Sequence, residues 1–129
     1  MTETPRKQTL RKHERLYEKA AMEEVFQKGN SIKNSPIKLL WLNDSKKGDL
    51  AVKVAFSVPK RIFKKAVTRN LLKRRMREAY RKHKIYETGL DGTCSLIFIY
   101  TSNKINPYAE IESKIVLTLQ HFKTATAVK

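Results

Sequence analysis

The sequence contains little cysteine, few acidic residues and few histidines. Its 129 residues include one cysteine, three histidines and 12 acidic residues. The cysteine and the histidines are scattered along the chain, so they do not form the closely spaced ligand sets of the usual zinc sites. We interpret Cys94, inside the apolar run CSLIFIY, as a buried strand residue in a reducing compartment.

Long apolar segments are also missing. No run approaches the roughly 20 residues that a membrane-spanning helix needs. The first residues, MTETPRKQTLRKHERL, contain no apolar signal-peptide core. We therefore expect a cytoplasmic protein that does not act at a membrane.

No catalytic constellation is recognisable. His13, His83 and His121 lie far apart in the sequence, and the acidic residues do not form the clusters that hold two metal ions. The four glycines form no phosphate-binding loop. The sequence predicts a binding protein with no catalytic and no metal-binding residues of its own.

The chain has a large excess of positive charge, with a formal net charge of +16 and a pI near 10.1. Such a charge favours nucleic acid as the partner. The length fits one domain. We expect a basic flexible tail at residues 1–12, a single domain at 13–123 and a second flexible tail at 124–129.

The densest basic stretch is residues 60–84, KRIFKKAVTRNLLKRRMREAYRKHK, where 12 of 25 residues are Lys or Arg and only Glu78 is acidic. At 100° per residue it forms an amphipathic helix. Its apolar side gathers Thr68, Leu72, Met76, Ala79, Tyr80 and His83. Its cationic side, the basic ridge, gathers Asn70, Lys73, Arg74, Arg77, Arg81 and Lys84. A rigid rod with this charge is a template for a polyanion.

The residues before this helix extend the positive surface. Lys60, Arg61, Lys64 and Lys65 lie in a predicted loop, the cationic loop of residues 60–65. Arg69 and Asn70 fall in the first helical turn, where free backbone N–H groups favour phosphate. We predict that these positions contact nucleic acid.

The remaining pattern predicts a helix over residues 14–28 that ends at Gly29, a loop over 30–36, and strands over 37–42, 50–58 and 93–100. A last helix begins near Asn106-Pro107 and ends near Phe122. The order is helix, two or three strands, basic helix, strand, helix. This indicates the α+β class with one sheet.

The strand at residues 50–58 alternates between two faces. One face carries Leu50, Val52, Val54, Phe56 and Val58, and the other carries Ala51, Lys53, Ala55 and Ser57. The second face is either a solvent face or the floor of a groove, and the sequence leaves both open. Met22 and Phe26 share one side of the first helix, where ordinary core packing is the plain interpretation.

Residues 56–61 (FSVPKR) and 66–81 (AVTRNLLKRRMREAYR) resemble the bacterial ribonuclease P protein component. The family's Arg-Asn-Arg-x-x-Lys-Arg signature corresponds to residues 69–74, although Leu71 replaces the second Arg. Residues 25–29 (VFQKG) are also similar. The resemblance spans roughly residues 10–122. The family's Gly-Asn before Ala-Val is replaced by FKK.

This resemblance implies a fold and a role. The fold is a two-layer α-β sandwich like a ribosomal-protein domain, with one mixed sheet, the order α-β-β-β-α-β-α and a left-handed βαβ crossover, whereas general rules favour a right-handed one. The role is that of the protein subunit of ribonuclease P, the endonuclease that removes the 5′ leader in tRNA processing. It would be a monomeric protein that binds the catalytic RNA and precursor tRNA, not DNA, while the RNA performs hydrolysis with Mg²⁺.

The resemblance also assigns residues. The catalytic-RNA contacts are Lys60, Arg61, Lys64, Lys65, Arg69, Asn70, Lys73, Arg74, Arg77 and Arg81. The cleft for the single-stranded leader is Met22, Phe26, Leu40, Lys53, Ala55 and Ser57, with Trp41 as the alternative to Leu40. The competing hypotheses are a structural ribosomal RNA-binding protein and, third, a DNA-binding regulator, for which the sequence lacks a helix-turn-helix pattern.

Overall fold

A computed structural model describes residues 19–44, 51–83 and 93–127 of this chain. Three helices and four strands follow one another in the described segments. They are α1 (Lys19–Lys28), β1 (Asn30–Asn34), β2 (Ile37–Asp44), β3 (Ala51–Ser57), α2 (Ala66–His83), β4 (Thr93–Tyr100) and α3 (Tyr108–Ala127). This order confirms the predicted α-β-β-β-α-β-α arrangement and the α+β class.

The four strands form one mixed sheet with the spatial order β1-β2-β4-β3. β1 pairs with β2 and β2 with β4 in antiparallel fashion, whereas β3 and β4 are parallel. Parallel neighbours need a crossover connection, and α2 supplies it. The βαβ unit on either side of the basic helix is therefore confirmed, and its left hand stays a prediction.

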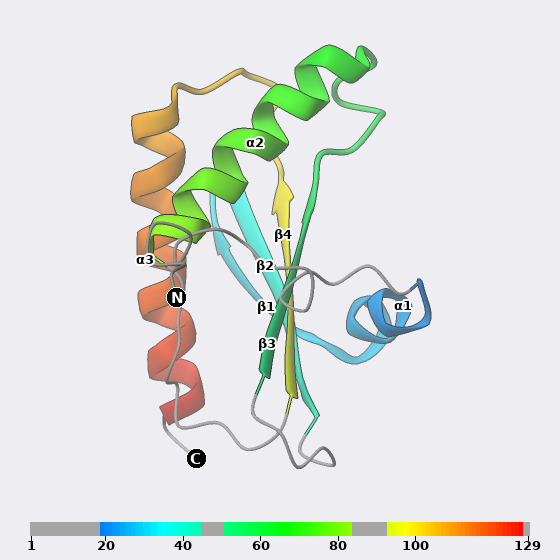
Figure 1. The fold of residues 1–129 in the computed structure, drawn as a ribbon, viewed down its shortest axis with the longest axis vertical. Helices are drawn as coiled ribbons and strands as arrows, with labels where there is room; N and C mark the ends of the chain where they lie inside the picture. Colours follow the sequence, from blue (N-terminus) through cyan, green and yellow to red (C-terminus); the bar gives the residue numbers. More distant parts are fainter. Residues whose placement is uncertain (1–18, 45–50, 84–92, 128–129) are drawn as a thin grey trace, which may run out of the picture.

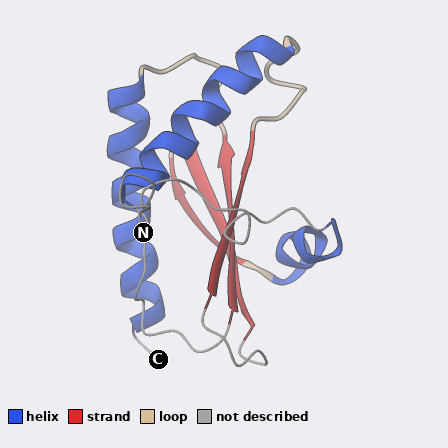
Figure 2. Ribbon diagram, in the orientation of Figure 1, coloured by secondary structure: helices blue, strands red, loops and turns tan. Residues whose placement is uncertain are grey.

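Helices cover both faces of this sheet (Figures 1 and 2). α2 and α3 lie together on one face and make up the helical layer of the sandwich. α1 lies on the opposite face, where it packs against β4 and β2. The two faces therefore carry separate cores of very different size.

The larger core fills the space between the sheet and the α2–α3 layer. Its centre is Phe98, which is fully buried, stacks on Phe56 at 5.7 Å between ring centroids and meets Tyr80 at 5.6 Å. Trp41 closes the α3 side of this core with its ring edge-on to Phe122. Burial of this much aromatic surface is the main force that fixes α2 to the sheet.

The smaller core holds α1 to the other face. Val25 is 1% exposed and packs over Ile97, which is fully buried. Gly29 ends α1 as predicted, and its N–H donates to the carbonyl oxygen of Val25 at 2.8 Å. A Cβ at Gly29 would lie 2.4 Å from that oxygen and 2.9 Å from the carbonyl oxygen of Trp41. Only glycine allows the end of α1 to approach β2 so closely.

Two sequence predictions about element limits are wrong. Residues 30–36 were expected as a loop, but Asn30–Asn34 form β1, an edge strand that pairs with β2 along its whole length. The last helix was expected to end near Phe122, but α3 continues to Ala127, into the residues predicted as a tail. Residues 1–12 and the first part of the predicted 14–28 helix lie outside the described residues.

Candidate nucleic-acid interface

The basic ridge of α2 has the orientation that its periodicity predicts. Leu72, Met76, Ala79 and Tyr80 are buried against the sheet. On the other side of the helix, Asn70, Arg74 and Arg77 are exposed, and Lys73 is half-buried. Lys84, the last predicted member of the ridge, lies outside the described residues. The exposed guanidinium groups stand on a helix that cannot rotate, because its apolar side is held in the large core.

The cationic loop that precedes α2 is held in place by backbone hydrogen bonds and by aromatic packing. The N–H groups of Ile62 and Phe63 donate to the carbonyl oxygen of Pro59, both at 3.2 Å, and close a turn. The Phe63 ring packs against Tyr100 with 5.9 Å between centroids. The loop's four cations, Lys60, Arg61, Lys64 and Lys65, are all exposed. The aromatic side chain of Phe63 is therefore half-buried against the core while the charges face solvent.

Arg69 holds this loop from the first turn of α2. Its Nη1 donates to the carbonyl oxygens of Phe63 at 3.0 Å and Lys64 at 2.9 Å. The sequence predicted Arg69 as a nucleic-acid contact, and its alternative task of loop support could not be recognised there. The remaining N–H groups of the guanidinium can still meet an anion, because the group carries five donors in all.

Arg75 fixes the other side of the helix to a neighbouring connection. Its Nη1 donates to the carbonyl oxygen of Asn106 at 2.6 Å, in the connection between β4 and α3. The buried Tyr100 hydroxyl donates to the carbonyl oxygen of Lys104 at 2.6 Å and accepts from the Asn106 N–H at 3.0 Å. Burial raises the pKa of Tyr100. These bonds fix the β4–α3 connection beside α2.

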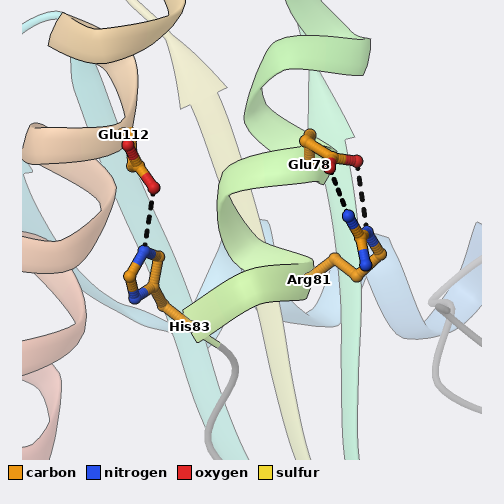
Figure 3. A network of polar contacts seen from close by, with 4 residues as sticks. All are labelled: Glu78, Arg81, His83 and Glu112. Atoms are coloured by element: carbon orange, nitrogen blue, oxygen red, sulfur yellow. Dashed lines mark hydrogen bonds and ion pairs between the residues drawn. The ribbon is translucent and has the colours of Figure 1, made fainter. Parts of the chain in front are cut away.

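The end of α2 carries an Arg–Glu ion pair and a His–Glu contact (Figure 3). Arg81 forms a bidentate pair with Glu78 one turn earlier, and this hydrogen bond lowers the pKa of Glu78 and raises that of Arg81. His83 meets Glu112 of α3 at 3.0 Å, and that contact lowers the pKa of Glu112. Arg81 is therefore partly neutralised within the protein, unlike the exposed Arg74 and Arg77.

The start of α2 is apolar where the family signature has its second Arg. Leu71 is half-buried, and Val67, one turn earlier, is 80% exposed. Neither side chain can contribute charge to the basic ridge. The positive surface at this end of the helix therefore comes from the cationic loop and from Arg69.

The candidate cleft residues lie together on the α1 face of the sheet. Met22, Leu40 and Ala55 pack around Val25 and Ile97 of the smaller core. Lys53, Ala55 and Ser57 follow one another along this face of β3, where all three are half-buried; we call them the small-residue column. Because α1 packs over β4 and β2, the column lies beside the helix and not beneath it.

Phe26 is not a core residue, because 53% of its side chain is exposed on α1. Leu40 and Trp41, the two predicted alternatives on this strand, face opposite sides of the sheet. Leu40 faces α1, whereas Trp41 faces the large core and Phe122. Leu40 and Ala55 are brought to either side of Ile97, which is the register partner of both and is buried beneath α1. The sequence could not reveal that pairing, because it depends on which strands become neighbours.

The described residues offer little other chemistry. Burial raises the pKa of Cys94 to about 12, so its thiol stays protonated and unreactive at neutral pH. No three His, Cys, Asp or Glu side chains gather as a metal-binding group within residues 19–44, 51–83 and 93–127. In the same segments, none of the helices is long and apolar enough to span a bilayer.

Comparison with known proteins gives one consistent answer. Residues 10–123 match the family model described as Ribonuclease P. A ribonuclease P protein component of Chlorobium phaeobacteroides is 43% identical over 79 residues, which cover 59% of this chain and 54% of that relative. One from Porphyromonas gingivalis is 36% identical over 75 residues, which cover 58% of this chain and 55% of the relative. The alignments thus span about half the length of these relatives.

Solved structures agree with the fold. The RNase P protein of Staphylococcus aureus superposes with a TM-score of 0.68 at 25% identity, over 87% of this chain and 97% of that one. The RNase P protein of Thermotoga maritima superposes with a TM-score of 0.67 at 21% identity, over 84% of this chain and 96% of that one.

Proposed function

Because this chain belongs to the ribonuclease P protein family, we propose that it is the protein subunit of a ribonuclease P, which binds the catalytic RNA and the 5′ leader of precursor tRNA. In this role it promotes 5′ maturation of tRNA, and the RNA subunit makes the cut. The protein supplies charge and shape to two RNA segments, and it needs no catalytic side chain of its own.

One observation carries this proposal: the molecule has two surfaces suited to RNA, and they differ in chemistry. α2 and the cationic loop present exposed cations such as Arg74, Arg77 and Lys64, which suit the phosphates of a folded RNA. The small-residue column beside α1 has one cation, Lys53, and two small half-buried side chains, Ala55 and Ser57, which leave the strand backbone open to an unpaired strand in this proposal. The exposed Phe26 ring offers a stacking surface for a base.

In this proposal the RNA subunit binds the magnesium ions. The described residues offer no group of three metal-ligating side chains, so they do not fit the role of a metal cage. Mg²⁺ supplies charge neutralisation and activation of water when it is bound by the RNA subunit. The protein's part is to reduce the repulsion between phosphates, because its cations displace condensed counterions.

Reconstitution tests the function. Adding this protein to a bacterial ribonuclease P RNA at low Mg²⁺ should accelerate cleavage of precursor tRNA, and should tighten binding of the precursor more than that of mature tRNA. The measurement is single-turnover cleavage with and without the protein. Unchanged cleavage, together with co-sedimentation with ribosomal subunits, would instead favour the structural ribosomal-protein alternative.

The Phe26→Ala variant tests the leader cleft. The exposed ring should stack on a leader base, and such contacts contribute about 1–3 kcal/mol per base. We therefore expect weaker binding of precursor tRNA, by roughly tenfold, with mature tRNA unaffected. Gln27→Ala, the next exposed position of α1, is the control and should bind both RNAs like the wild type. Equal losses on precursor and mature tRNA would remove Phe26 from the cleft.

A further inference from the structure

Two lysines face each other across the β1–β2 pair, on the side of the sheet where α1 lies. Lys33 on β1 is the register partner of Lys38 on β2. The adjacent residues Ile32 and Leu39 pack into the large core on the opposite side. Because side chains alternate along a strand, both lysines must face the α1 side. Lys33 is exposed and Lys38 is half-buried.

This lysine pair forms no ion pair within the described part of the protein. The ion pairs found there join Glu24 to Lys28, Glu78 to Arg81 and Glu112 to His83, and none reaches Lys33 or Lys38. Like charges directly opposite one another on adjacent strands destabilise a sheet. An external anion between the two ammonium groups would relieve that repulsion.

The pair also continues the small-residue column. Lys38 pairs with Ile99, and Ile99 pairs with Ser57, so a single row crosses the sheet from Lys33 on one edge to Ser57 on the other. Three strand spacings make this row about 14 Å long. We call it the cross-sheet row, and it consists of Lys33, Lys38, Ile99 and Ser57.

The cross-sheet row is accessible beside α1. Ile97, two residues before Ile99 on the same face of β4, is fully buried under Val25 of the helix. Ile99 and Ser57 are only half-buried, and the exposure rises to Lys33 at the edge strand. The row therefore begins at the polar side chain of Ser57, which also belongs to the small-residue column. It continues with an apolar surface at Ile99 and ends with two cations.

We propose that Lys33 and Lys38 bind phosphates of the single-stranded leader, beyond the part of the leader that the small-residue column holds. This inference rests on the proposed leader-binding function and extends the binding path across the whole sheet. An unpaired RNA strand fits the row because its bases can lie on the apolar surface of Ile99 while its backbone meets the ammonium groups.

The test is the double variant Lys33→Gln/Lys38→Gln, assayed with precursor tRNAs whose leaders are shortened one nucleotide at a time. Two lost phosphate contacts on a single strand should weaken binding of the long-leader precursor roughly tenfold at about 0.15 M salt, and should make the salt slope shallower by about 1.4. The defect should vanish once the leader is too short to reach the row. Mature tRNA should bind as it does to the wild type.

Three controls accompany this test. Lys33→Arg/Lys38→Arg keeps both charges and should keep the affinity for long leaders. Lys114→Gln/Lys123→Gln removes the same charge from α3, on the other side of the sheet, and should not discriminate between leader lengths. The unfolding temperature of the Lys33→Gln/Lys38→Gln protein should equal or exceed that of the wild type, because a like-charge repulsion is removed.

The outcomes separate this inference from the function on which it rests. If the wild type prefers precursor over mature tRNA but the Gln variant binds all leader lengths like the wild type, the lysine site is wrong and the leader cleft stands. The lysine site is equally wrong if the Gln variant's defect persists on mature tRNA. If the wild type itself shows no preference for a leader, the proposed function fails and this inference fails with it.

Discussion

Replacing Arg74 and Arg77 together by alanine should weaken binding to the catalytic RNA roughly 30-fold at about 0.15 M salt. Both guanidinium groups are exposed on the ridge of α2, and neither is paired with a carboxylate of the described residues. Each lost contact to a duplex phosphate should make the slope of log K against log salt shallower by about 0.9. The affinity should fall about fivefold per lost contact at this ionic strength. Binding titrations over a range of salt concentrations measure both quantities.

A charge control and a stability measurement accompany this experiment. Lys114→Ala/Lys123→Ala changes the net charge equally, but on α3, and should leave the affinity within about twofold of the wild type. The free energy of unfolding of the Arg74→Ala/Arg77→Ala protein should be nearly that of the wild type. Exposed substitutions away from special contacts usually change it by less than about 0.5 kcal/mol. A double Arg74→Ala/Arg77→Ala variant with the wild-type salt slope would show that these side chains do not contact the RNA.

Gly29→Ala should have the largest effect on stability. The new Cβ would overlap two backbone oxygens, at 2.4 Å for Val25 and 2.9 Å for Trp41, and neither atom can move without shifting α1 or β2. Overpacking against rigid groups costs about 3 kcal/mol. In a domain of this size the midpoint of thermal unfolding should then fall by about 10 °C. Differential scanning calorimetry and urea unfolding measure the loss.

The same substitution should separate the two proposed RNA surfaces. Because Gly29 sets the distance between α1 and the sheet, its replacement should disturb the leader cleft and spare the ridge on α2. At temperatures where the variant is still folded, its affinity for precursor tRNA should fall, while catalytic-RNA binding stays near that of the wild type. Gln27→Ala is the matched control in α1. An unchanged unfolding midpoint in Gly29→Ala would show that α1 can withdraw from β2 without cost.

Local periodicity explains what the sequence could predict. The spacing of Leu72, Met76 and Ala79 identifies the buried side of α2, since helix geometry converts spacing directly into orientation. The alternation along residues 50–58 likewise separates the large-core side of β3 from the small-residue column. Both inferences depend only on neighbours along the chain, and both are confirmed.

The remaining features depend on partners distant in sequence. β1 has the sequence NSIKN, in which Ile32 is the only apolar residue, so no pattern marks it as a strand until β2 supplies its hydrogen bonds. Nothing in the basic stretch marks Arg69 and Arg75 as the two arginines that bond to backbone carbonyl oxygens. Their bonding to the carbonyl oxygens of Phe63 and Asn106 arises from the tertiary arrangement of two loops.

The limit of α3 was mistaken for a related reason. Residues 124–127, TATA, continue no apolar stripe and carry no strong helix signal beyond the two alanines. In the structure the Thr124 hydroxyl donates to the carbonyl oxygen of Gln120, so the extension is supported by a bond within the helix itself.

The parallel pairing of β3 with β4 has a consequence for how this chain folds. β1 and β2 meet across a short turn, whereas Ala51 and Thr93, register partners in β3 and β4, are about 40 residues apart. Loop-closure entropy delays such distant pairing until α2 has formed and docked. The strand with the small-residue column is therefore expected to join the sheet late in folding. An RNA that binds only the completed sheet stabilises the state in which β3 is paired with β4. The affinity for that RNA and the population of native protein are therefore thermodynamically linked.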